Sequence, residues 1–256
     1  MTPTLPDLVD FAVRLADTAG KRTLAYYQTD LQVDSKADES PVTIADREAE
    51  MMIRQAIQAR FPGHRIIGEE FGDDGRDSPY KWIIDPIDGT KSFITGVPFY
   101  ANLIGLEIEG EVVLGISNFP ALGEMMVAAK GMGTWINGCR VRVSSVNRLK
   151  DARVMITDLR HASAVPQAAG ASRLLQECKF YRTWGDAYGH YLVAAGRADV
   201  ALDPLMNPWD CAPFGIILKE AGGWFGDWDG KDTIYGPNAV SANPDLIGEV
   251  LTVLKG

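Results

Sequence analysis

The densest group of potentially reactive side chains lies in the stretch from Trp82 to Thr90, WIIDPIDGT. An apolar run that is typical of a strand leads there directly into two aspartates, which are three residues apart and separated by a proline. Pro86 restricts its own φ and favours an extended conformation for Asp85, so Asp85 and Asp88 can point into one site with the Ile87 carbonyl between them. Carboxylate and carbonyl oxygens on a rigid turn suit a hard cation such as Mg²⁺.

The residues that follow these aspartates suit a phosphate group. Gly89, Thr90 and Lys91 are expected to open a short helical turn, whose exposed amides could hold phosphate oxygens. The Thr90 hydroxyl could orient a water molecule. The structural alternative is an ordinary turn, because Asp-Pro and Asp-Gly pairs are common in loops.

Two other acidic segments lie far from this stretch in the sequence. Glu69 and Glu70 follow a strand-like run, as Asp85 does, although a glutamate pair alone is more often solvated surface. Asp210 stands in the segment Asn-Pro-Trp-Asp before an apolar helix, where it could simply cap that helix. A capping position would still allow one carboxylate oxygen to reach a metal ion.

Composition and charge exclude several classes of function. The 256 residues are 46% apolar and 23% charged, as in ordinary globular proteins, and the formal net charge of −9 argues against a nucleic-acid binder. The three cysteines show no metal-ligand or disulfide spacing and are expected to be reduced thiols. The N-terminus has neither a basic start nor a long apolar run, so we expect a cytoplasmic protein that does not bind membranes.

The arrangement of expected elements favours a layered α+β fold. Helical apolar spacing covers about the first 25 residues, and a second helix begins after Thr43, with Asp46 as part of its cap. Strand-like segments dominate residues 65–117, and a helix after Trp209 ends at two glycines. The pattern of expected helices and strands changes near residue 145. This change predicts an N-terminal helix-and-sheet half at 1–145 and a C-terminal α/β half at 146–256.

Several ordered motifs together resemble one family. GEE, WIIDPIDGT and NPWD with a following helix that ends in EAGG are similar to the inositol-monophosphatase superfamily of lithium-sensitive, magnesium-dependent phosphomonoesterases. The segment KADESPVTIAD, Lys36 to Asp46, resembles the loop that leads into the second helix of that superfamily. The resemblance covers nearly the whole chain and implies a layered αβαβα sandwich of the inositol-monophosphatase/fructose-bisphosphatase type, a small phosphorylated metabolite as substrate and a homodimer.

The resemblance also implies how the acidic residues divide between metal ions. Glu69, Asp85 and the Ile87 carbonyl would bind one Mg²⁺, and Asp85 would bridge to a second ion held by Asp88 and Asp210. A third, weaker ion near Glu69 is possible. One ion would activate water and the other would stabilise the leaving oxygen, so no protein nucleophile is needed.

The remaining roles in the reaction are carried over in the same way. The catalytic set implied is Glu69, Thr90 and Asp46, and the phosphate-binding set is Asp88, Gly89 and Thr90. His64, His161 and His190 show no pairing with a serine or cysteine motif, so we interpret them as surface or packing residues.

Within the superfamily, the C-terminal half most resembles the bacterial histidinol-phosphate phosphatases. RTWGDAYGHYLVAAGRADVALDPLMNPWD and GGWFGDWDG carry this resemblance, which implies that Asp186, Asp203 and Asn207 bind the leaving group. Extra carboxylates suit the ammonium group of histidinol. Two observations leave the substrate open: Asp186 could cap a helix, and Asp203 stands where many members have glutamate.

Two rival functions follow from the same motifs. The first keeps the phosphatase reaction and changes the substrate to inositol monophosphate, fructose 1,6-bisphosphate or a 3'-phosphorylated adenine nucleotide. The second is a non-enzymatic regulator associated with RNA or a polymerase, as some bacterial relatives are.

Overall fold

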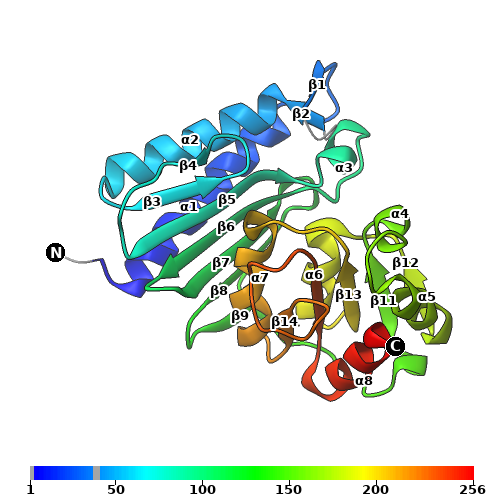
Figure 1. Cartoon of the computed structure of the whole chain (residues 1–256). Helices are drawn as coiled ribbons and strands as arrows, with labels where there is room; N and C mark the ends of the chain where they lie inside the picture. The colour runs from blue at the N-terminus through cyan, green and yellow to red at the C-terminus, as the bar shows by residue number, and fades with distance from the viewer. Residues whose placement is uncertain (1–2, 37–40) are drawn as a thin grey trace.

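The computed structural model describes residues 3–36 and 41–256, and these residues form alternating layers of helices and strands (Figure 1). The order is a helix pair, a large sheet, a second helix pair, a smaller sheet and a last helix pair. The predicted α+β fold with αβαβα layers is therefore confirmed. Residues 37–40, which belong to the segment between Lys36 and Asp46 that carried part of the family resemblance, lie outside the described residues.

The first layer consists of α1 (Leu5–Leu24) and α2 (Ile44–Arg60), both predicted from their apolar spacing. Each begins with a capping box, in which a threonine and an aspartate three residues later satisfy each other's backbone amides. Their apolar faces pack with the large sheet in one core cluster, which contains Trp82. The second cap is the predicted one, formed by Thr43 and Asp46.

The large sheet has eight strands in the order β10-β9-β8-β7-β6-β5-β3-β4. All neighbours are antiparallel except β3 and β5, which run parallel. Its strands are β3 (Arg65–Gly68), β4 (Gly72–Asp73), β5 (Tyr80–Asp88), β6 (Ala101–Ile108), β7 (Glu111–Phe119), β8 (Glu124–Ala129), β9 (Gly133–Ile136) and β10 (Cys139–Val141). The parallel pair puts the carboxyl ends of β3 and β5 at the same edge of the sheet.

The middle layer, α6 (Asp186–Ala194) and α7 (Pro208–Glu220), lies between the two sheets (Figure 1). Glycines on the neighbouring strands β6 and β7 let α7 approach the large sheet closely. A Cβ atom on Gly105 would lie 2.7 Å from the Ala212 Cβ, and one on Gly115 would lie 2.3 Å from the Pro213 carbonyl oxygen. This contact fixes the helix that begins just before Asp210.

The small sheet has the order β12-β11-β13-β15-β14, with β12, β11 and β13 parallel. Its far face is covered by α5 and α8, which pack with it in a separate core cluster. The elements are β11 (Arg153–Ile156), α5 (Ala168–Glu177), β12 (Phe180–Arg182), β13 (Val200–Asp203), β14 (Trp224–Gly226), β15 (Ala239–Ala242) and α8 (Pro244–Lys255). The large sheet thus comes from the N-terminal half and the small sheet from the C-terminal half, although the domain division at residue 145 stays a prediction.

Besides two short 3₁₀ helices at Pro120–Leu122 and Leu149–Asp151, four further short elements lie in the described part of the chain. They are the hairpin of β1 (Val33–Ser35) and β2 (Pro41–Thr43), and the single-turn helices α3 (Thr90–Ile94) and α4 (Leu159–Ala162). The helical turn predicted after Gly89 is α3. Within residues 3–36 and 41–256, no helix combines the length and apolar character needed to cross a membrane.

We expect Gly115→Ala to destabilise the protein by about 2 kcal/mol, because the added methyl group would press on the α7 backbone in a packed core. Gly63→Ala is the matched control, since nothing lies within 4 Å of the added methyl group there. Urea unfolding monitored by circular dichroism measures both changes. Equal free energies of unfolding for the two variants would contradict the packing argument.

Candidate active site

The parallel pairing of β3 with β5 brings the first two acidic segments together. Gly68 is in register with Ile84, so the residue after each, Glu69 and Asp85, lies at the same sheet edge. The Glu69 amide donates to the Ile84 carbonyl at 3.3 Å and extends this alignment beyond the last paired residues. A glutamate and an aspartate 16 positions apart in the sequence thereby become neighbours.

The turn after Asp85 is held by its own side chain. The Asp85 carboxylate accepts a hydrogen bond from the Ile87 amide at 2.9 Å, and the Asn102 side chain on β6 donates to the Pro86 carbonyl at 2.7 Å. The β5–β6 register shifts between Asp85 and Asp88, which marks a local irregularity. The turn therefore has an imposed shape and is not a free loop.

Gly89 then redirects the chain into α3. It has a φ of 75°, a left-handed conformation that glycine adopts without strain, and it occupies the N-cap position of this short helix. The Thr90 hydroxyl donates to the Ile87 carbonyl at 3.1 Å. Thr90 and the predicted carbonyl ligand Ile87 are consequently in direct contact.

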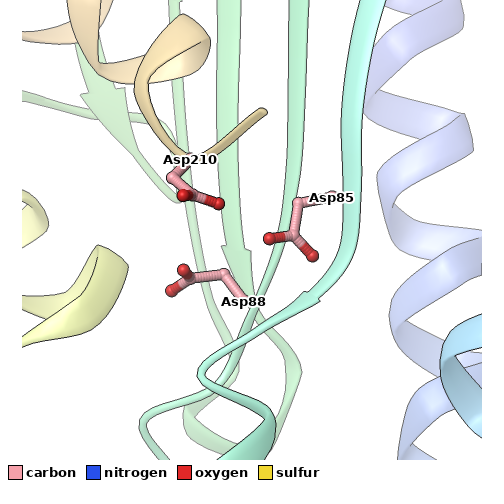
Figure 2. A group of neighbouring side chains, drawn as sticks. All are labelled: Asp85, Asp88 and Asp210. Atoms are coloured by element: carbon pink, nitrogen blue, oxygen red, sulfur yellow. The ribbon is translucent and has the colours of Figure 1, made fainter. Parts of the chain in front are cut away.

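Asp210 reaches the site from the other half of the chain, on the first turn of α7. One of its oxygens, Oδ2, accepts the Asn207 amide at 2.7 Å, so the predicted capping role is real. Asp85, Asp88 and Asp210 each offer a carboxylate oxygen within 4.8 Å of the others. Figure 2 shows these three side chains pointing toward one another from β5, the end of β5 and α7. Capping and metal binding are thus compatible at Asp210.

This crowding has a clear electrostatic signature. Burial raises the pKa of Asp85 well above its usual range, and the charges of Glu69 and Asp88 raise it further. Burial also raises the pKa of Asp88, with added repulsion from Asp186 and Asp210. Burial raises the pKa of Asp210 to about 7. Carboxylates that repel one another in this way are the donor set that a divalent cation neutralises, so the residues fit a hard metal ion.

Glu69 lines the same cleft but is not one of the three converging carboxylates. Its Oε1 accepts a hydrogen bond from Lys36 at 2.7 Å, and Lys36 also donates to Glu70 at 2.6 Å. Burial opposes the charge on Lys36, but these two hydrogen bonds raise the pKa of its ammonium group. The buried Glu50 on α2 accepts the Glu70 amide at 2.7 Å and so fixes the turn that presents Glu69.

Asp46 is fully buried at the start of α2 and is absent from the residues that line the cleft. Its Oδ2 accepts the hydroxyl and the amide of Thr43 at 2.6 Å and 2.8 Å. Its Oδ1 has no hydrogen-bond partner among the described residues. Burial raises the pKa of Asp46, and the nearby charge of Glu69 contributes to this shift. Asp46 therefore lies near Glu69 but outside the cleft lining, and its Oδ1 can accept a further hydrogen bond.

The cleft has a volume of about 210 Å³, and its opposite wall comes from the C-terminal half. All three predicted leaving-group residues, Asp186, Asp203 and Asn207, line it. The Ala187 amide at the start of α6 donates to Asp88 at 2.7 Å, which joins this wall to the carboxylate cluster. The structure thus gathers every predicted site residue except Asp46 into one cleft.

Sequence reasoning gave no role to four polar residues on the cleft or at Glu69, namely Lys36, Thr157, Asp158 and His161, and it gave Lys91 only a backbone role. Asp158 and His161 form a pair at 3.2 Å, so the prediction of His161 as a surface or packing residue was incomplete. A usable signal existed for Asp158. It stands just beyond β11, as Glu69 stands just beyond β3, and both strands end at the cleft.

Comparison with known proteins shows which family the chain resembles along its length. The sequence profile described as the Inositol monophosphatase family matches residues 5–253. A histidinol-phosphatase from Chlorobaculum parvum is 48% identical to the chain over 240 residues, which is 93% of this chain and 92% of that protein. The Nus factor SuhB of Escherichia coli is 32% identical, over 97% of this chain and 96% of its own.

A solved structure agrees with the fold. An IMPase from Thermotoga maritima superposes with a TM-score of 0.88 and 32% sequence identity, and the match covers 97% of each chain. The likeness therefore extends through both sheets and all the helical layers. Since the family profile and these relatives span almost the entire sequence, the chain belongs to the inositol monophosphatase family.

Proposed function

We propose that this protein is a magnesium-dependent phosphomonoesterase that hydrolyses L-histidinol phosphate to L-histidinol and phosphate, a step of histidine biosynthesis. The reaction class is supported above all by the convergence of Asp85, Asp88 and Asp210, whose oxygens lie within 4.8 Å of one another. The substrate is supported by the 48% identity to the histidinol-phosphatase from Chlorobaculum parvum.

Two ions would be held by ligands from both halves of the chain. Glu69, Asp85 and the Ile87 carbonyl would hold the first, and Asp85, Asp88 and Asp210 the second, and a third, weaker ion would bind near Glu69. When bound, Mg²⁺ lowers the pKa of a water molecule and neutralises negative charge on the phosphate and the leaving oxygen. The Lys36 ammonium already satisfies part of the negative charge at Glu69.

The protein groups around these ions position the reactants. Thr90 and Glu69 would orient the attacking water, and the unpartnered Oδ1 of Asp46 would accept a hydrogen bond from a water behind Glu69. The amides of Gly89 and Thr90, together with the turn at Asp88, would hold the phosphate oxygens. Water would then attack phosphorus in line with the ester oxygen, and no covalent enzyme intermediate is required.

The far wall of the cleft favours a cationic leaving group. Burial raises the pKa of Asp203, and the neighbouring Asp186 raises it further, so the two carboxylates repel each other. An ammonium or imidazolium group between them would relieve that repulsion through charge-assisted hydrogen bonds, with Asn207 as an additional polar partner. A neutral polyol offers no such compensation.

We also propose that the enzyme acts as a lithium-sensitive homodimer in the cytoplasm.

A second candidate function has specific support from the relatives named Nus factor SuhB. In this alternative the chain would act as a partner in an assembly that contains RNA or a polymerase, and hydrolysis would be secondary. The net charge of −9 does not favour direct contact with RNA. Asp85→Asn separates the alternatives, since it should abolish hydrolysis but leave a partner-binding role intact.

For substrate choice, we expect kcat/KM for L-histidinol phosphate to exceed that for inositol 1-phosphate, fructose 1,6-bisphosphate and 3'-phosphoadenosine. Asp186→Asn should lower kcat/KM for L-histidinol phosphate by about tenfold or more through loss of a charge-assisted hydrogen bond. Phosphate release measured for all four compounds, with wild type and variant side by side, provides the check. Equal or faster hydrolysis of inositol 1-phosphate by the wild type would overturn the assigned substrate.

For metal binding, we expect MgCl2 to raise the Tm of the wild type and to leave that of Asp85→Asn nearly unchanged. The substitution removes the carboxylate that both ions would share, while the amide oxygen can still accept the Ile87 hydrogen bond. Asp17→Asn, in an exposed ion pair on α1, is the control and should respond to MgCl2 as the wild type does. A full magnesium response in Asp85→Asn would rule out the bridging role.

The pH dependence of stability without metal should run opposite to ordinary acid denaturation. Burial raises the pKa of Asp210 to about 7, so the folded state holds a proton there that the unfolded state has already lost above its usual pKa near 4. Stability in EDTA should therefore fall as the pH rises from about 5 to about 7. Asp210→Asn should flatten this slope in urea titrations at several pH values; an unchanged slope would show that Asp210 is not the source.

A further inference from the structure

Thr157 contacts both acidic residues of the leaving-group wall, the side chain of Asp203 and the backbone of Asp186. Its hydroxyl is 2.6 Å from Asp203 Oδ2 and 2.8 Å from the Asp186 amide nitrogen. Thr157 itself lines the cleft. Neither the family resemblance nor the reaction scheme above gives this residue a role.

Strand pairing explains the first of these contacts. β11 and β13 run parallel with Ile156 opposite Leu202, so the next residues, Thr157 and Asp203, lie side by side at the carboxyl edge of the small sheet. The Thr157 amide donates to the Leu202 carbonyl at 3.3 Å and continues the pairing. The hydroxyl and the carboxylate thus meet because of backbone register.

A glycine explains the second contact. The chain that enters α6 passes so close to Thr157 that a Cβ atom on Gly185 would lie 2.1 Å from the Thr157 Cα. This approach delivers the Asp186 amide to the Thr157 oxygen. Asp186 itself has a φ of 49°, in the left-handed region that non-glycine residues rarely adopt. In this strained conformation the Asp186 amide donates its hydrogen bond to the Thr157 hydroxyl oxygen.

The direction of both hydrogen bonds follows from the number of protons that the Asp186 amide and the Thr157 hydroxyl carry. A backbone amide can only donate, so the Thr157 oxygen accepts from Asp186. The single hydroxyl proton is then available for Asp203 Oδ2, which only accepts when ionised. The other oxygen of Asp203 accepts a long bond of 3.4 Å from the Leu205 amide and is left for a ligand. One side chain therefore fixes the orientation of Asp203 and the backbone position of Asp186.

We propose that Thr157 is a positioning residue that sets the spacing of Asp186 and Asp203 and so makes the cleft selective for phosphate esters with a cationic leaving group. This inference rests on the proposed function, because it assigns selectivity to the same site. Thr157 takes no part in the transfer of the phosphoryl group. Its loss should therefore weaken binding of the leaving group more than it slows the chemical step.

The test compares Thr157→Val, which keeps the shape and removes the hydroxyl, with Thr157→Ser, which keeps the hydroxyl. Each variant and the wild type are assayed with L-histidinol phosphate and with glycerol 2-phosphate, whose leaving group is neutral, and binding of L-histidinol is measured by calorimetry. Thermal unfolding shows whether each variant is folded.

We expect Thr157→Val to raise KM for L-histidinol phosphate and Kd for L-histidinol by about tenfold, with a smaller change in kcat. The effect on glycerol 2-phosphate should be several times smaller, and Thr157→Ser should restore most of the selectivity. Equal losses on both substrates, or failure of serine to rescue, would show a merely structural role and overturn the inference.

The same measurements separate this inference from the proposed function. A wild type without preference for L-histidinol phosphate over glycerol 2-phosphate would overturn the assigned substrate, and the role of Thr157 with it. A wild-type preference that persists unchanged in Thr157→Val would leave the substrate assignment standing and overturn the role of Thr157 alone.

Discussion

Mutual repulsion among closely packed carboxylates is the constraint on which the rest of this structure depends. Burial and neighbouring charge raise the pKa of Asp85, Asp88 and Asp210, so ionising all three where the fold places them is unfavourable. The fold nevertheless holds them together, with the first two on a central strand and the third on a helix pressed against glycines of the same sheet. This arrangement lowers local stability, and the cation of the proposed function would restore it.

The parts of the fold that the sequence predicts well are those with local causes. The capping pair Thr43 and Asp46 and the regular apolar spacing define α2, and the strand leading into Asp85 is visible as an apolar run. Pairing between distant strands has no local cause. That β3 lies parallel to β5, which makes Glu69 a neighbour of Asp85, follows from tertiary structure and entered the sequence prediction only through family resemblance.

The residues of the site divide in the same way into those that a local motif identifies and those that only tertiary structure brings together. Motif residues such as Asp85 and Asp88 could be selected because their spacing already suggests chemistry. Lys36 opens a family-like segment and Asp158 stands just beyond a strand, but no local pattern shows that Lys36 pairs with Glu69 or that Asp158 pairs with His161. Asp46 shows a third case: its local pattern predicts a helix cap, and the structure adds a second carboxylate oxygen that has no partner among residues 3–36 and 41–256.

The hydrogen bond from the Ala187 amide to Asp88 makes the two walls of the cleft thermodynamically interdependent. A ligand that favours one placement of α6 also favours one placement of Asp88, a carboxylate of the proposed metal site, and linkage requires the influence to be reciprocal. Under the proposed function, leaving groups that fit the C-terminal wall should thus tighten ion binding by the same factor by which the ions tighten binding of the leaving group. One coupling free energy would then set both how well the protein discriminates between leaving groups and how tightly it holds the ions.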